Sequence, residues 1–222
     1  MTDFRKPFIA ICAAALFALT GSAADTDNVK WSFDLRAGDD GAPRIEGKHK
    51  LLYHGKTDLT VENGALLLDH TATVAPRTYN IGYVFEPELT APGGVLVAEY
   101  RGALVKPGEN PTIPVFNLYL AGSAGEGKPV YASLASITAV GITTNAGVYA
   151  PAGFDTREMH TVRATLDTAT GDFTLAVDGK PALRGKLKPA AKGKPQIWFG
   201  DGSAKMNGRA KIEYLRVGKL AD

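Results

Sequence analysis

One stretch of the chain, HTVRATLDTATGDFTLAVDG (160–179), constrains the fold more than any other. Apolar and polar side chains alternate over 162–166, the alternation resumes after a turn near Gly171, and it stops at the Asp-Gly pair 178–179. A period of two with β-branched and aromatic residues is typical of half-buried antiparallel strands, and Asp-Gly favours a tight turn. The stretch is therefore predicted to form two neighbouring strands of an antiparallel sheet.

Similar runs recur along the chain between clusters of Pro and Gly, and no segment after residue 24 shows sustained helical periodicity. Many short strands separated by turns predict an all-β fold, a two-sheet antiparallel β-sandwich of the jelly-roll type. Trp31, Phe33 and Leu35 are expected to point into its core, and the first strand is expected to pair near the last one. The predicted strands, besides the two above, are 29–36, 64–70, 79–85, 95–102, 114–122, 129–137, 196–200 and 210–218.

The first 24 residues have the layout of a secretory signal peptide, with Arg5 and Lys6 ahead of an apolar run and small residues after it. The apolar run is shorter than the roughly 20 residues that a transmembrane helix needs. We therefore expect a secreted or periplasmic protein whose residues 25–222 form one domain without a transmembrane segment. The only cysteine, Cys12, lies within the signal peptide, so the core and not disulfides must stabilise that domain.

Charge excludes one class of partner. The chain has 25 Lys and Arg residues against 23 Asp and Glu, a formal net charge of +2. A protein whose main partner is nucleic acid generally carries a larger positive excess. Nucleic acid is therefore not expected as the partner.

The segment 158–218 resembles the C-terminal half of bacterial laminin-G-like domains, which belong to the concanavalin A-like lectin/glucanase superfamily. The features that carry the resemblance are a hairpin ending in Asp-Gly, a Phe-Gly-Asp turn, a later Gly, and a last strand with a Tyr. The resemblance implies a concanavalin A-like sandwich over 25–222, but jelly rolls of this kind host lectins, hydrolases, lyases and spacers. In this sequence the carriers are Asp178, Gly179, Phe199, Gly200, Asp201, Ser203, Gly208 and Tyr214.

Catalytic patterns of the superfamily are not found in the sequence. A retaining glucanase needs two carboxylates close together on one strand, and the Glu-x-Asp-x-x-Glu spacing is absent. The segment 196–198 resembles the Gln-x-His strand of jelly-roll alginate lyases, but Trp198 stands where their histidine would be. The sequence thus favours a non-catalytic protein, and no catalytic residue is assigned.

Four residues on two predicted strands are candidates for ligand binding. Glu99 and Arg101 share one face of their strand, and Asn117 and Tyr119 point outward if their apolar neighbours point inward. Aromatic rings stack on sugar rings while amides and charges bind hydroxyls, so these side chains would suit a sugar if they gathered on a concave sheet. The alternative is structural, with Tyr119 packing at a sheet rim and Glu99 pairing with a cross-strand cation.

Two further features are candidates for charged ligands. The segment 184–195 contains five cations and no acid, and such a loop is either simply solvated or meets an acidic polysaccharide or another anionic surface. Asp201, in a tight turn, either caps backbone N–H groups or holds a structural calcium ion; no other cofactor is expected. The cations of the basic loop are Arg184, Lys186, Lys188, Lys192 and Lys194.

The function expected from the sequence is that of an exported, non-catalytic β-sandwich that binds carbohydrate or another envelope or extracellular partner. Two alternatives remain open at this stage. One is a polysaccharide-active hydrolase or lyase on the same scaffold, and the other is a purely structural or assembly protein.

Overall fold

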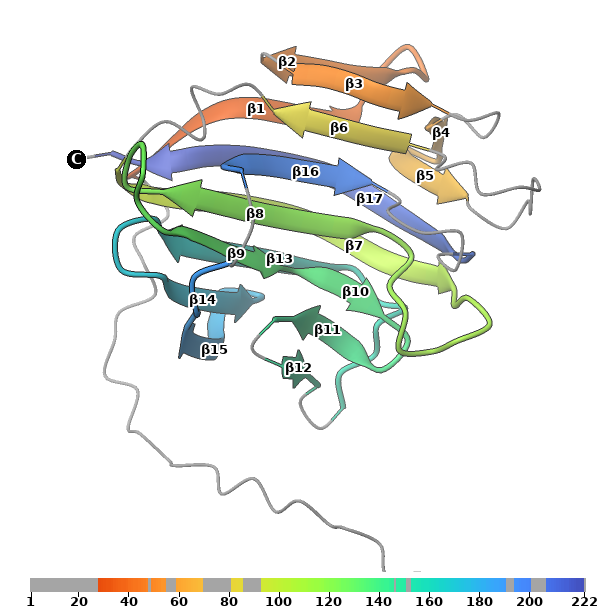
Figure 1. Ribbon diagram of the computed structural model, residues 1–222. Coiled ribbons are helices and arrows are strands. Elements are labelled where there is room, and N and C mark those ends of the chain that lie inside the picture. The colour runs from red at the N-terminus through yellow and green to blue at the C-terminus, as the bar shows by residue number, and fades with distance from the viewer. Residues whose placement is uncertain are drawn as a thin grey trace, which may run out of the picture.

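The fold is known from a computed structural model, which describes most of the chain after residue 27 (Figure 1). For the strands at 49–54 and 81–85 only the backbone is described. The predicted signal peptide lies outside the described residues. These are 28–47, 49–54, 59–69, 81–85, 93–145, 147–150, 153–190, 194–200 and 207–221.

The described residues form antiparallel β-sheets, as the alternating sequence pattern predicts, and two of these sheets face each other as a sandwich (Figure 1). The larger, sheet A, has nine strands. Their order is β15 (Lys180–Lys186), β14 (Asp172–Val177), β13 (His160–Asp167), β7 (Val95–Lys106), β17 (Arg209–Leu220), β1 (Val29–Ala37) and β2 (Pro43–Gly47). The remaining two strands are β5 (Ala65–Asp69), which pairs with β17, and β4 (Thr60–Glu62), which pairs with β5.

The opposite layer, sheet B, has five strands, and a small third sheet lies beside it. Sheet B runs in the order β3 (His49–His54), β6 (Ile81–Phe85), β16 (Gln196–Gly200), β8 (Asn117–Ser123) and β9 (Val130–Leu134). The third sheet contains β10 (Ser136–Thr138), β11 (Gly141–Thr144) and β12 (Gly147–Tyr149). The predicted run 129–137 therefore forms strand, divided between β9 and β10.

The two strands predicted within 160–179 form the hairpin β13–β14, and its turn depends on a glycine. Gly171 has a φ of +76°, and a Cβ added there would lie 2.5 Å from the ring of Tyr131. In the next turn, Asp178 and Gly179 both have positive φ values of 50° and 74°. Two successive positive φ angles are those of a type I′ turn, whose twist matches that of the strands it joins. The turn residues thus account for the β13–β14–β15 meander.

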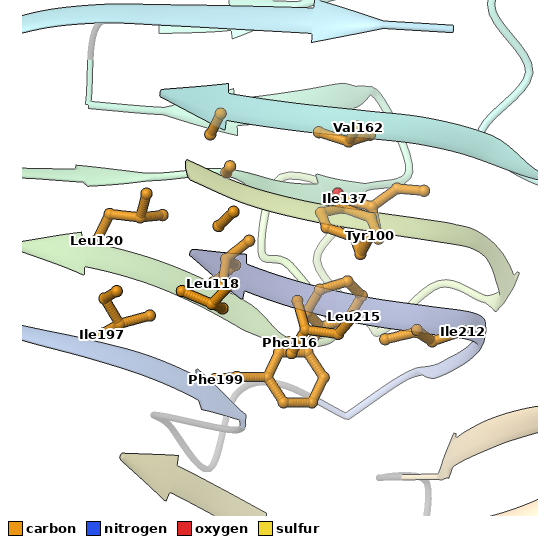
Figure 2. Close-up of a cluster of buried hydrophobic side chains, with 14 of the residues drawn as sticks. Tyr100, Phe116, Leu118, Leu120, Ile137, Val162, Ile197, Phe199, Ile212 and Leu215 are labelled. Carbon is orange, nitrogen blue, oxygen red and sulfur yellow. The ribbon is translucent and has the colours of Figure 1, made fainter. Parts of the chain in front are cut away.

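The core fills the space between the two sheets. In Figure 2, side chains from β7, β13 and β17 of sheet A point toward side chains from β8 and β16 of sheet B. Three fully buried rings form a chain across the core: Tyr100 packs edge-on against Phe116 at 5.3 Å between ring centroids, and Phe116 lies 5.2 Å from Phe199. Full burial of one large apolar side chain stabilises the folded state by about 1.5–3 kcal/mol relative to leaving it exposed. The core can therefore stabilise the domain without disulfides.

The prediction for the first strand is correct in pairing and wrong for one side chain. β1 pairs with β17, and Phe33 and Leu35 are buried in the core as predicted. Trp31 is not, because the register changes from Trp31 opposite Gly218 to Phe33 opposite Val217. This β-bulge turns the indole to the outer face of sheet A.

Candidate functional site

Glu99 lies on the outer face of sheet A, where two arginines neutralise it. One cross-strand row places it between Arg163 on β13 and Arg216 on β17. Its Oε2 accepts from Arg163 Nε at 2.7 Å, and its Oε1 accepts from Arg216 Nη2 at 2.5 Å and from the Tyr214 hydroxyl at 3.0 Å. Only 4% of Glu99 is exposed. Glu99 thus has the structural role that the sequence offered as the alternative, a carboxylate paired with cross-strand cations.

The charges around Glu99 fit a stabilising role better than a catalytic one. Burial by itself raises the pKa of Glu99, but the hydrogen bonds and charges of Arg216 and Arg163 outweigh burial and hold the pKa below its usual value. The Arg216 guanidinium also lies 4.6 Å from the ring centroids of both Trp31 and Tyr214, within the range of cation–π attraction. Glu99 is therefore charged at neutral pH, and both of its oxygens accept hydrogen bonds, so it is unsuited to donating a proton.

The four ligand-binding candidates do not lie together. Arg101 shares the outer face of sheet A with Glu99 and pairs at 2.7 Å with Glu213. Asn117 and Tyr119 belong to β8 in sheet B, where Leu118 and Leu120 are buried in the core and the two candidates point away from it. The two pairs thus lie on opposite outer faces of the sandwich. Strand alternation predicts which side chains share a face of one strand. It does not predict which of the two sheets that strand belongs to.

Sheet B brings Tyr119 beside Trp198, which is not among the ligand-binding candidates predicted from the sequence. In the β8–β16 register, Trp198 lies directly opposite Tyr119, and both side chains are half-buried on the outer face. Directly opposed side chains have Cβ atoms about 4.5–5.5 Å apart, so the rings are immediate neighbours. Asn117 and Gln196 extend the same face along these two strands. We call Asn117, Tyr119, Gln196 and Trp198 the aromatic face.

The aromatic face combines flat apolar rings with neutral hydrogen-bonding groups. The Asn117 carboxamide oxygen accepts from the Ser136 hydroxyl at 3.3 Å, which orients the amide. Burial raises the pKa of Tyr119, so its hydroxyl stays protonated at neutral pH and remains both donor and acceptor. Rings that stack and neutral groups that bind hydroxyls are what recognition of an uncharged sugar requires.

The basic loop is only partly a loop. Arg184 and Lys186 lie on β15, the edge strand of sheet A, and Lys188 follows shortly after it. These three cations and Lys194 are exposed. Lys192 lies outside the described residues.

The calcium prediction is centred on Asp201, which also lies outside the described residues. Among the residues that are described, no group of three or more His, Cys, Asp or Glu side chains could hold a metal ion. Within the same part of the chain, no helix has the length and apolar character of a membrane span.

A half-open cleft of about 310 Å³ lies between the end of β7 and residues 153–157. Leu104, Pro107 and Phe154 contribute to its apolar lining. His160 braces this segment, because its Nδ1 binds the Asp178 carboxylate at 2.7 Å, its Nε2 binds the Asp155 carbonyl at 2.9 Å, and its ring packs on Phe154 at 4.3 Å. His160 is thus a structural residue, with both ring nitrogens in use.

The sequence matches no protein-family model and no curated protein sequence. Solved structures resemble the chain in three dimensions. The carbohydrate esterase vb_24B_21 from the Shiga toxin-encoding bacteriophage phi24B is 12% identical, with a TM-score of 0.55 over 87% of this chain and 100% of its own. The β-glucanase of Bacillus licheniformis is 10% identical, with a TM-score of 0.50 over 86% of this chain and 99% of its own.

These likenesses show the fold, an antiparallel β-sandwich of the jelly-roll type. A further neighbour is botulinum neurotoxin type C, 10% identical with a TM-score of 0.51, where the match spans 88% of this chain and 49% of the toxin chain. Cell entry of that toxin is described as dependent on interaction with two ganglioside molecules. At such identities the likeness shows the β-sandwich fold alone and says nothing of the ligand.

Proposed function

We propose that the protein is an exported, non-catalytic concanavalin A-like domain that binds neutral carbohydrate on the aromatic face. The observation that carries the proposal is the cross-strand pair Tyr119–Trp198, flanked by the amides of Asn117 and Gln196. Export rests on the predicted signal peptide at 1–24. The carbohydrate-related neighbours support the ligand class, since a carbohydrate esterase, a β-glucanase and a ganglioside-dependent toxin share the scaffold.

The position and the charge of Glu99 exclude it as the acid of a glycosidase that acts at the aromatic face. A glycosidase of either stereochemistry needs one carboxylic acid whose pKa is raised so that it can protonate the leaving group. Glu99 has a lowered pKa, both of its oxygens accept hydrogen bonds, and it lies on the sheet opposite the aromatic face.

The experiment uses residues 25–222 in affinity electrophoresis through gels that contain neutral polysaccharides. We expect at least one polymer to retard the protein and Trp198→Ala to weaken binding about ten-fold or more, the equivalent of about 1.4 kcal/mol. Trp31→Ala is the matched control, because it removes the only other tryptophan from the opposite outer face. It should leave retardation unchanged, whatever it does to thermal stability.

A fluorescence titration gives a direct reading of the same site. In a Trp31→Phe variant Trp198 is the sole tryptophan, so its emission should shift when the retarding sugar is added. Unchanged mobility in every neutral polymer, or equal loss in both tryptophan variants, would refute the aromatic face as the site. Release of reducing ends or unsaturated sugars would instead establish the enzyme alternative.

A further inference from the structure

A second surface, on the other sheet, has different chemistry. Arg184, Lys186 and Lys188 follow one another at alternate positions, and we call these three residues the basic ridge. Arg184 lies opposite Thr174 and Lys186 opposite Asp172 in the β14–β15 register. Thr174 points to the outer face of sheet A, where its hydroxyl meets that of Thr165 at 2.5 Å. Arg184 and Lys186 therefore point to that outer face as well.

The ridge continues two residues beyond the end of β15. Leu187 donates its N–H to the Gly171 carbonyl at 2.9 Å and is buried in the core, so Lys188 points outward like Lys186. Alternate residues of an extended strand lie about 6.5 Å apart. At strand spacing the ridge is a file of three positive charges that spans about 13 Å.

The ridge keeps a positive excess within the described part of the chain, where Asp172 opposite Lys186 is the only acid in the β14–β15 register with it. No ion pair involves Arg184, Lys186 or Lys188 there. Asp172, the acid nearest in register, accepts a hydrogen bond from the Thr170 hydroxyl at 2.7 Å. Exposed like charges in a row create a local positive potential that attracts anionic ligands.

The shape of the edge selects among anionic ligands. Addition of a peptide strand to β15 is disfavoured for two reasons. Pro181 has no backbone N–H to donate, and the β14–β15 register shifts between Leu175 and Ala176. Prolines and β-bulges at a sheet edge both hinder the pairing of a further strand. Binding to a lipid surface normally adds exposed apolar side chains to the cations. The exposed large apolar residues of the described chain are Val105, Val140 and Val148, none of them on β15. A linear polymer with regularly repeated charges fits the ridge better than either.

We propose that the basic ridge is a second carbohydrate site, which binds a linear acidic polysaccharide carrying carboxylate or sulfate groups along the edge of sheet A. This site is independent of the aromatic face, since the two surfaces belong to different sheets. One surface takes uncharged sugar rings and the other takes repeated negative charges.

The test compares dextran sulfate and polygalacturonate with uncharged dextran in affinity gels. The variant is Arg184→Gln/Lys186→Gln/Lys188→Gln, and the matched control is Lys30→Gln/Lys106→Gln/Arg157→Gln, which removes three exposed charges from other parts of the chain. We expect the ridge variant to bind an acidic polymer about ten-fold more weakly and the control to bind it as wild type does. Raising the salt from about 0.1 to about 1 M, which shortens the Debye length from about 10 to about 3 Å, should abolish binding.

The outcomes separate this site from the aromatic face and from bulk charge. Trp198→Ala should retain binding to the acidic polymers even where it loses a neutral one. Equal losses in the two triple variants would mean that net charge alone is responsible, and would overturn the ridge. Failure of wild type to bind either acidic polymer, or tighter binding to vesicles that contain phosphatidylglycerol, would overturn it too.

Discussion

The buried charge cluster gives the sharpest prediction about stability. Glu99→Gln preserves the shape of the side chain but removes the charge that Arg163 and Arg216 share. Breaking a buried ion pair by removing one partner costs about 3–5 kcal/mol. The Arg163 and Arg216 side chains keep 13% and 32% of their exposure, so water offsets part of the loss. We therefore expect the lower end, about 3 kcal/mol, or a fall in Tm of about 6–12 °C for a chain of this size.

The assay is thermal unfolding followed by circular dichroism at a series of pH values. Glu213→Gln is the control, because its carboxylate is 52% exposed and makes one surface ion pair with Arg101, worth about 0–1 kcal/mol. The pKa of Glu99 is lowered in the folded protein, so its stabilisation is complete above the ordinary carboxyl range, about pH 4.3, and is lost as the pH falls through the folded-state pKa. The gap between wild type and Glu99→Gln should stay constant from neutral pH down to about 5 and close only in stronger acid. Equal Tm values for the two variants at pH 7 would refute the reasoning.

Three further perturbations have defined outcomes. Gly171→Ala should lower the free energy of unfolding by about 2 kcal/mol in urea titrations, because a Cβ there meets the ring of Tyr131 at a φ of +76°; no change would mean that the turn relaxes freely. Asp178→Asn keeps a residue type that tolerates positive φ but loses the charged contact with His160. Burial raises the pKa of Asp178, but the hydrogen bonds from His160 and Thr161 outweigh burial, so the net effect is a lowered pKa. The variant should therefore have a lower Tm than wild type at pH 6. The Tm values of the two proteins should converge as the pH falls through the lowered pKa of Asp178. A calcium ion at Asp201 predicts that EDTA lowers Tm and that calcium restores it, whereas an unchanged Tm leaves Asp201 as a turn cap.

The fold was predictable where the information is local. Alternation of side chains and the Asp178-Gly179 turn are properties of a few neighbouring residues, and they predict the β13–β14 hairpin and the turn after it correctly. Strand β15, which follows that turn and contains part of the expected basic loop, was not predicted. Trp31 shows the limit of such patterns. Its direction depends on a bulge formed against β17, nearly the whole chain away, and a strict period of two carries no sign of that bulge.

The site was predictable only in part for the same reason. The outward direction of Tyr119 follows from its own strand, but its neighbour Trp198 comes from a strand about 80 residues later, and only the sheet order brings them together. In the sequence, Trp198 stands out only as the residue at the position of the histidine of jelly-roll alginate lyases. Glu99 was separated from Tyr119 by the same sheet order, which no residue-by-residue pattern encodes.

The pairing of β1 with β17 also determines when this protein is able to fold. β17 is the shared neighbour of β1, β5 and β7, so the centre of sheet A does not exist until the last strand of the chain has been synthesised. Contacts of such long sequence separation make folding slow, because a large loop must close before any of them forms. A chain that ends before residue 209 therefore lacks the strand that joins β1 and β5 to β7. Sheet A is then left as the separate pieces β15–β14–β13–β7, β1–β2 and β4–β5, and its completion waits for the end of the chain.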